Sequence, residues 1–190
     1  MYQLRSLIEN LVRFSDSDWD KMNRLISHKT IKKGDLILYP DKICTSISFI
    51  KEGTFRTFRL DEKGFERNFL FHFENSFITD YESFLHQKPS EFYIECLAEA
   101  HVLTINYKTI QQLYEEMPGF EKLGRLIAEG LYLSAKRRVE DFMFLNPEER
   151  YKKLIRLQPE IFKKIPVGMI AEYINIRPQS LSRIRKRVYI

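Results

Sequence analysis

The stretch Pro166–Val188, PVGMIAEYINIRPQSLSRIRKRV, predicts a helix, a tight turn and a second helix. In the first helix, Ile170 and Ile174 recur at the spacing of a buried face, and the small side chain of Ala171 allows the second helix to approach closely. Asn175 stands at the turn, where a left-handed backbone is needed and where Asn is tolerated better than most residues.

The second predicted helix has an apolar and a polar face. Ile176 is expected to fill the gap between the two helices, and Leu181, Ile184 and Val188 follow at i, i+3 and i+7 as the inward stripe. The opposite face carries Gln179, Ser180, Arg183 and Lys186.

The polar face has the residue types that read DNA. Gln can bond adenine bidentately and Arg can bond guanine, so Gln179 and Arg183 suit base-edge reading in a major groove. Arg185, Lys186 and Arg187 suit phosphate contacts, which supply affinity without sequence information. The full set of expected DNA-contacting residues is Arg177, Gln179, Ser180, Ser182, Arg183, Arg185, Lys186 and Arg187.

The charge distribution favours the same interpretation. From residue 165 to residue 190, four Arg and one Lys stand against Glu172, which gives +4 of the +5 carried by the whole chain. A basic cluster on a terminal helix indicates a polyanionic partner. The alternative is a basic amphipathic helix that packs on its own domain or touches acidic lipid.

The segment before this motif is also helical. Residues 118–145 predict a helix of about 28 residues, with an apolar stripe through Phe120, Leu123, Ile127, Leu131, Ser134, Arg138 and Phe142. A helix this long favours dimerisation, with an intramolecular connector as the alternative. Asn146-Pro147 ends it and starts a helix over Glu148–Leu157, which residues 158–166 connect to the terminal motif.

Residues 30–106 have the texture of a β-domain. Runs rich in β-branched and aromatic residues alternate with turn signals such as Lys33-Gly34-Asp35 and Glu52-Gly53, which predicts a sandwich or barrel. The expected strands are Leu36–Tyr39, Ser46–Lys51, Thr54–Leu60, Phe65–Phe71, Phe92–Ala98 and His101–Ile105. Residues 1–28 predict two helices, the second capped within Ser15–Asp18.

Composition and motifs exclude several function classes. The chain has no Gly-rich phosphate loop, GxSxG or HExxH motif, so no enzyme is expected. Cys44 and Cys96 are too far apart for zinc or iron–sulfur spacing and are interpreted as buried thiols in strands, so no metal and no cofactor is expected. The N-terminus reads as neither a signal peptide nor a membrane span, which predicts a cytoplasmic bacterial protein without a membrane partner.

The ordered set of motifs resembles the Crp/Fnr superfamily of dimeric transcription regulators over nearly the whole chain. Lys33-Gly34-Asp35 resembles the opening turn of its cyclic-nucleotide-binding β-roll, and Ser48–Gly53 resembles the strand that ends in Gly. Tyr107–Ile110 with Met117-Pro118 is similar to the entry into the dimer helix. Phe142–Leu145 with Glu149-Arg150 is similar to the end of that helix and the start of the DNA-binding domain.

The resemblance breaks at the phosphate-binding cassette of the nucleotide-binding members. There, Arg pairs with the cyclic phosphate and Glu accepts from the ribose. Here Asp80 stands at the Glu position, and Ser90-Glu91 stands where the family has Arg-Ser. A carboxylate ~4 Å from a phosphate costs on the order of a few kcal/mol at an effective dielectric of about 20.

We therefore expect no tight binding of cyclic AMP or cyclic GMP, with Lys88 as the alternative source of the missing cation. The degenerate pocket is expected around Asp80, Tyr81, Ser90 and Glu91. It is interpreted as vestigial or as the site of another, unknown small-molecule effector.

The resulting fold class is α+β, and the expected domains are three. Residues 1–117 form an N-terminal double-stranded β-helix (jelly-roll) sensor domain with its helices, 118–145 the dimerisation helix, and 146–190 the helix-turn-helix domain. The resemblance implies a homodimer on a near-palindromic duplex, with RNA polymerase as a further partner. The alternative function is a cytoplasmic small-molecule sensor that acts through protein partners rather than DNA.

Overall fold

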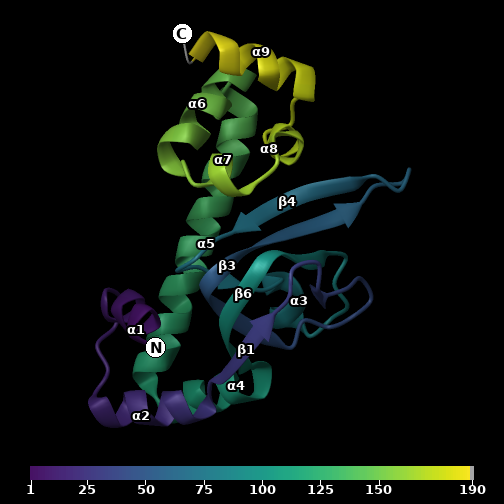
Figure 1. Cartoon of the computed structure of the whole chain (residues 1–190). Helices are drawn as coiled ribbons and strands as arrows, with labels where there is room; N and C mark the ends of the chain where they lie inside the picture. The colour runs from purple at the N-terminus through teal and green to yellow at the C-terminus, as the bar shows by residue number, and fades with distance from the viewer. Residues whose placement is uncertain (189–190) are drawn as a thin grey trace. The chain divides into compact units, whose positions relative to one another are not determined.

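The computed structural model describes the backbone of residues 1–188 and the side chains of residues 1–187 (Figure 1). The chain divides into two compact units. Unit 1 contains residues 1–59 and 70–128, and unit 2 contains residues 60–69 and 129–190.

Unit 1 begins with two amphipathic helices, α1 (Tyr2–Glu9) and α2 (Asp16–Leu25). Ser15 caps α2 as predicted, because its hydroxyl accepts from the Asp18 backbone N–H while the Asp18 carboxylate accepts from the Ser15 N–H. The expectation of helix up to residue 28 is wrong, because strand β1 (Ser27–Ile31) begins directly after α2. Its alternation of Ser27, Lys29 and Ile31 on one face is the signal that the helical interpretation overlooked.

The sheet of unit 1 is built on two long strands, β3 (Ser46–Leu60) and β6 (Tyr93–Asn106), which pair antiparallel. Strand order is β1-β6-β3-β4, with β4 spanning Glu66–His72. The short strands β2 (Leu36–Leu38) and β5 (Phe77–Ile78) add to β6 and β3 respectively. The β-rich domain expected for residues 30–106 is therefore confirmed as an antiparallel β-roll with helices.

Two predicted breaks in the strands are bulges instead. Gly53 was expected to end a strand, but β3 passes through it with a shifted register on both sides. Its φ is +109°, and a Cβ there would lie 2.4 Å from the Cβ of Ala100 on β6. Gly53 is therefore required both by its backbone conformation and by the close approach of Ala100. On the partner strand, β6 likewise continues from Ala98 to His101, where a break was expected.

The remaining helices of unit 1 cover the roll. The one-and-a-half-turn α3 (Tyr81–His86) follows β5, and α4 (Tyr107–Glu116) follows β6. Two apolar clusters hold the unit together: one inside the roll around Phe55, Ile94 and Cys96, and one between the roll and the helices around Trp19 and Leu113. Cys96 is in a strand as predicted, whereas Cys44 lies just before β3 rather than within a strand.

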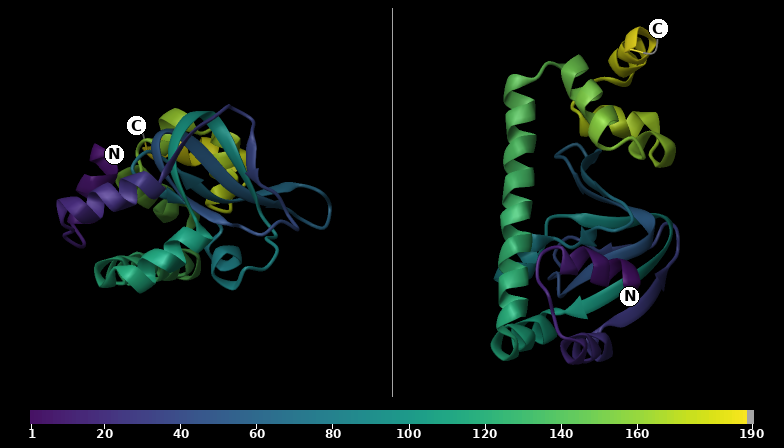
Figure 2. Two further views of the ribbon diagram at one scale, coloured as in Figure 1. Left: turned by 90° about the horizontal axis from the view of Figure 1, so that it is seen from below. Right: turned by 90° about the vertical axis from the view of Figure 1, so that its left-hand side faces the viewer.

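Helix α5 (Pro118–Phe144) is one continuous helix of 27 residues, close to the predicted length (Figure 2). Its first part belongs to unit 1, where Leu123 is buried against the N-terminal helices. Its second part belongs to unit 2, together with α6 (Pro147–Leu157), α7 (Ile161–Lys164), α8 (Val167–Tyr173) and α9 (Pro178–Val188). The short helix α7 was expected only as a connector.

Residues 60–69, which comprise the end of β3, the turn and the first part of β4, also belong to unit 2. Asn68 donates to the Glu172 carboxylate of α8 at 2.5 Å, and Arg67 lies 3.8 Å from the same carboxylate. Arg138 of α5 stacks over the ring of Tyr173 at 4.0 Å and donates to its carbonyl. Unit 2 is therefore held by polar and cation–π contacts around the end of α8 as well as by its core.

Candidate functional site

The turn between α8 and α9 has the geometry that the sequence predicts. Asn175 is left-handed, with a φ of +55°. The Ile176 N–H donates to the Ala171 carbonyl at 2.9 Å, and the Asn175 N–H donates to the Glu172 carbonyl at 2.8 Å. These two bonds form a Schellman motif, which ends α8 sharply and fixes the direction of the following chain.

The second helix begins at once because Pro178 occupies its first position. Beneath α9, Leu181 and Ile184 are 0% and 4% exposed, and they contribute with Ile170 and Ala171 to the core of unit 2. Ile176 is half-buried between the helices. The expectation for Val188 as the last member of the stripe falls outside the described side chains.

The outer face of α9 carries the predicted cations and amides. Gln179, Ser182, Arg183 and Lys186 are exposed, as are Arg177 before the helix and Arg187 near its end. Ser180 and Arg185 are half-buried. Seven of the eight predicted residues thus belong to α9 and Arg177 directly precedes it, and six of the eight are open to solvent.

Two of these side chains make contacts inside unit 2. Arg187 lies 3.4 Å from the Glu148 carboxylate at the start of α6, and Arg183 Nε donates weakly to the Gln179 carbonyl at 3.5 Å. Both arginine side chains remain exposed, and exposed ion pairs of this kind contribute little. They can therefore be exchanged for phosphate or base contacts at small cost.

Arg150 of α6 anchors the α8–α9 pair from behind. Its Nε donates to the Ile174 carbonyl at 3.1 Å, and its Nη1 donates to the Leu145 carbonyl at 2.7 Å. The guanidinium therefore ties the end of α8 to the end of α5. Asn146 and Glu149 form a reciprocal capping box at the start of α6, as the predicted stop and restart require.

The exposed part of α5 presents an apolar seam. Tyr132, Val139 and Phe142 are 67%, 57% and 38% exposed, and together with Ala128 and Ala135 they recur at the alternating spacing of four and three residues. Such spacing is typical of a coiled-coil contact. Of the sequence-predicted stripe, only Phe142 belongs to this seam. Leu123 is buried, Phe120 and Ile127 pack within unit 1, and Arg138 contacts Tyr173.

The predicted pocket residues are engaged in local structure instead of facing an open site. Asp80 caps α3 by accepting from the Ser83 N–H, and it also accepts from the Ser90 hydroxyl at 2.6 Å. Ser90 is buried and in turn accepts from the Phe92 N–H at 2.9 Å. Asp80 and Ser90 are therefore brought together, as the family comparison implies, but they satisfy each other.

The other two predicted pocket residues point elsewhere. Glu91 is 78% exposed at its side chain and lies 3.3 Å from Arg59. Tyr81 packs against the core of the roll, and burial raises the pKa of its hydroxyl. Lys88, the alternative cation, is exposed.

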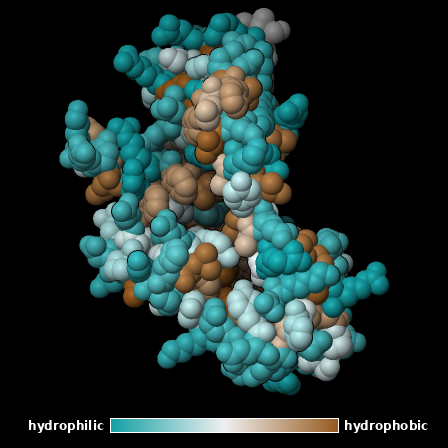
Figure 3. All heavy atoms as spheres, turned by 180° about the vertical axis from the view of Figure 1, so that it is seen from behind, coloured by the Kyte–Doolittle hydropathy of each residue, from teal (hydrophilic) through white to brown (hydrophobic). Residues whose placement is uncertain are grey.

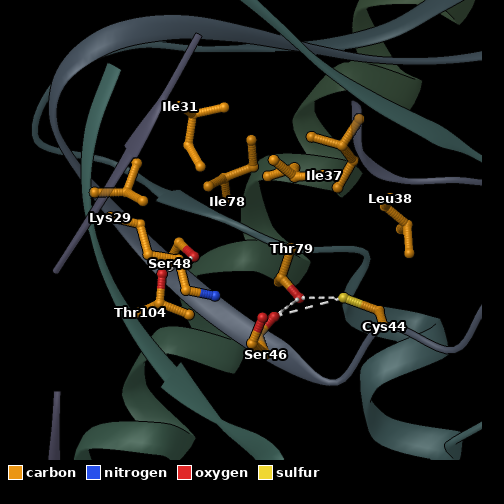
Figure 4. Close-up of a pocket in the computed structure, with 12 residues that line it drawn as sticks. Lys29, Ile31, Ile37, Leu38, Cys44, Ser46, Ser48, Ile78, Thr79 and Thr104 are labelled. Carbon is orange, nitrogen blue, oxygen red and sulfur yellow. Dashed lines mark hydrogen bonds between the residues drawn. The ribbon is translucent and has the colours of Figure 1, made fainter. Parts of the chain in front are cut away.

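A cavity of about 100 Å³ lies elsewhere in the roll, on the face of the sheet formed by β1, β6 and β3 (Figure 4). The pairs Lys29–Val102 and Ser48–Thr104 place four of its side chains on that face. The lining residues are Lys29, Ile31, Ile37, Leu38, Cys44, Ser46, Ser48, Ile78, Thr79, Ile94, Val102 and Thr104. None of the four pocket residues predicted from the sequence is among them.

The cavity was missed because two of its elements were missed. Lys29 belongs to β1, which was interpreted as the end of a helical region, and Thr79 follows β5, which was not expected as a strand. The alternation of Ser46 and Ser48 before buried residues is the one signal in the sequence that small polar side chains line the interior of the roll.

The buried thiols and the titratable groups show no metal cluster. Within residues 1–188, no group of three or more His, Cys, Asp or Glu is arranged to hold a metal ion. Both cysteines are buried and free, and burial raises the pKa of Cys96 to about 11. In the same part of the chain, no helix is long and apolar enough to cross a bilayer.

Comparison with known proteins places this geometry in context. Residues 28–117 match the cyclic nucleotide-binding domain family. No curated protein gives a significant match to the sequence.

Three solved structures illustrate the likeness. A protein from Eubacterium rectale, described as a transcriptional regulator of the Crp/Fnr family, matches with a TM-score of 0.70 and 15% identity, covering 92% of this chain and 83% of that one. FixK2 from Bradyrhizobium japonicum matches with a TM-score of 0.68 and 15% identity over 86% and 84%. The c-di-GMP-responsive regulator CLP of Xanthomonas campestris matches with a TM-score of 0.66 and 12% identity over 92% of both chains. The fold is that of these regulators, so the predicted resemblance to the Crp/Fnr family is confirmed at the level of the fold.

Proposed function

We propose that this chain, which carries a cyclic nucleotide-binding domain and shares its fold with Crp/Fnr regulators, is a DNA-binding transcription regulator that acts as a cytoplasmic homodimer. The observation that carries the proposal is the α8–α9 pair, a helix-turn-helix with a buried aliphatic face and an exposed cationic one. The pair matches the unit that inserts its second helix into a major groove.

The recognition surface divides into two kinds of contact. Gln179 and Arg183 lie one helical turn apart on the exposed face of α9, so both reach in the same direction. They are assigned to base edges, and Lys186 and Arg187 are assigned to phosphates. Phosphate contacts release counterions, so affinity falls steeply with salt.

The seam on α5 supports a dimer. Apolar side chains of this size are rarely left in water along a whole helix, and a second copy of the same seam would cover them. Figure 3, which views the molecule from behind, shows apolar side chains at the surface among hydrophilic ones. A two-fold dimer presents two recognition helices to half-sites about 34 Å apart.

The nucleotide pocket is proposed to be non-functional for cyclic AMP and cyclic GMP. The Asp80–Ser90 bond occupies the place where the family positions its phosphate ligands, and the neighbouring residue Glu91 directs its carboxylate to Arg59 and supplies no cation. A fluorescent cyclic AMP analogue is expected to show no saturable binding below millimolar concentration.

Sedimentation and DNA binding test the proposal together. Wild type is expected to sediment as a dimer at micromolar concentration and to bind duplex DNA with a steep, linear dependence of log affinity on log salt. The double substitution Tyr132→Asp/Val139→Asp places charges in the seam and is expected to give folded monomers with much weaker DNA binding. A monomeric wild type, or salt-independent binding, would instead favour a sensor that acts through protein partners.

A further inference from the structure

The cavity in the β-roll combines three kinds of side chain that together select a ligand class. Its polar side is made by the hydroxyls of Ser46, Ser48, Thr79 and Thr104, and its apolar side by aliphatic side chains. Lys29 contributes a single ammonium group, and Figure 4 shows this side chain extending over the hydroxyls of Ser48 and Thr104. From these features we propose that the cavity binds a small aliphatic carboxylate, of about the size of butyrate.

The charge in the cavity favours an anion. No lining residue carries a carboxylate, and Lys29 forms no ion pair with any residue in the described part of the chain. Lys29 is exposed, so water partly screens its ammonium group, but among the described residues it is the one charged side chain that lines the cavity, and the charge it offers is positive. A neutral ligand of the same shape would not use this group.

The hydroxyls supply donors for the same carboxylate. Ser48 Oγ and Thr104 Oγ1 lie 2.8 Å apart and are buried, so one of the two hydroxyls donates to the other. Each hydroxyl carries a single proton, so the accepting hydroxyl keeps its own proton for a further acceptor. A carboxylate oxygen placed between Lys29 and this pair would receive that proton together with an ammonium hydrogen bond.

The other end of the cavity is apolar and sets the size of the ligand. Ile31 and Ile78 line it, Ile37 lies partly exposed at its rim, and Val102 lies opposite Lys29 in the pairing of β1 with β6. A dry cavity of about 150 Å³ accommodates benzene, which has six heavy atoms, so about 100 Å³ encloses about four heavy atoms of a ligand. The four carbons of butyrate match that number, with the propyl chain on the isoleucine side and the two carboxylate oxygens directed to the exposed Lys29.

The site is separate from the pocket that the family comparison predicts. Asp80, Tyr81, Ser90 and Glu91 do not line it, and every lining residue belongs to unit 1. The proposal therefore does not depend on DNA binding by α9.

Calorimetric titration of sodium butyrate into the full chain, without DNA, tests the inference. Wild type is expected to bind one butyrate per chain, with a dissociation constant of roughly millimolar or tighter. Butyramide has the same shape without the charge, and inorganic phosphate has charge without the apolar chain. Both are expected to bind at least about tenfold more weakly.

Two variants locate the site, with a matched control. Lys29→Met keeps the length of the side chain and removes the charge, and it is expected to weaken butyrate binding at least about tenfold. Thr104→Val removes one hydroxyl while keeping the shape of the side chain. Butyrate binding by this variant provides a second test if Lys29→Met alters the fold. Lys33→Met removes a neighbouring exposed charge that does not line the cavity and is expected to bind butyrate like wild type.

No binding of butyrate by folded wild type would overturn the proposal, and so would equal binding by Lys29→Met or equal binding of butyramide. Because no DNA is present, these outcomes say nothing about the proposed regulator function. Failure of one inference is therefore distinguishable from failure of the other.

Discussion

The segment from Asp80 to Glu91 and helix α9 are both rich in polar side chains, but they use those side chains in opposite ways. In the first, Asp80, Ser83 and Ser90 form hydrogen bonds with one another or with nearby backbone, so their polar atoms already have partners within the fold. In α9, Gln179, Arg183 and Lys186 face solvent. The difference teaches that residue type alone does not identify a site, because the same chemistry builds a loop in one place and a binding surface in the other.

The largest expected contrast is between a buried and an exposed arginine. Arg56 of β3 lies directly opposite Glu95 of β6, pairs with it at 2.6 Å and stacks on Phe58 at 4.1 Å. Arg56→Ala is expected to cost about 3–5 kcal/mol of stability, because it leaves Glu95 without its partner in a largely buried position. Arg183→Ala should change stability by less than about 0.5 kcal/mol. Urea unfolding of the two variants measures both values, and similar losses would contradict the contrast.

A second expected effect is a pH dependence that originates in unit 1. Burial lowers the pKa of His72 on β4 to about 4, against an ordinary value of 6.5. Between pH 4 and 6.5 the folded state therefore keeps His72 neutral whereas the unfolded state is protonated. The contribution of His72 to the free energy of unfolding is complete above pH 6.5 and is lost as the pH falls towards 4. The loss is on the order of 3 kcal/mol.

Urea unfolding at several pH values between 4 and 7 checks this expectation, with His72→Gln as the reference. Carboxylates titrate equally in both proteins, so the difference between the two stability curves isolates the histidine. A difference that stays constant across this range would show that His72 does not titrate in this way.

A third expected effect concerns DNA. Arg183→Ala should weaken binding to a preferred duplex by about 10- to 100-fold, or about 1–3 kcal/mol, because a bidentate contact to guanine is lost. Arg24→Ala removes an exposed arginine from α2 in unit 1 and serves as the matched control. Fluorescence anisotropy at one fixed salt concentration gives both affinities. Equal effects of the two substitutions would exclude a specific role for Arg183.

The smallest expected contrast compares the same substitution in the two regions. Ser90→Ala removes a buried hydroxyl that donates to Asp80 and accepts from Phe92, and it is expected to cost about 1–2 kcal/mol. Ser182→Ala on the exposed face of α9 should leave stability unchanged within about 0.5 kcal/mol. Thermal unfolding of the pair provides the measurement, and a reversed order would refute the division into engaged and available side chains.

Local signals explain how much of the structure was predictable. The α8–α9 turn was predicted at Asn175 because the tolerance of Asn for a left-handed backbone and the aliphatic spacing both act within a few positions. The start of β1 and the continuity of β3 through Gly53 depend on partners far along the chain, above all Ala100 of β6, and no local pattern encodes them. Local propensity was overruled there by tertiary pairing.

The sites show the same division. The cationic face of α9 follows from helical periodicity, so its residues were identified from the sequence. The cavity assembles Lys29, Cys44, Ser48 and Thr79 from separate parts of the roll, and their meeting depends on the register between strands. The hydrogen bond between Ser90 and Asp80 could likewise not be predicted from the sequence, although both residues were expected at the degenerate pocket.

The central claim is that α9 reads a DNA sequence as one half of a two-fold dimer, and selection from a randomised duplex pool tests it most directly. Wild type and Gln179→Ala/Arg183→Ala protein would be taken through several rounds of selection at two salt concentrations. The expected result is enrichment of a two-fold-symmetric sequence by wild type alone, with half-sites about one helical turn apart. Weak, salt-sensitive binding that is equal in both proteins and enriches no sequence would contradict the claim.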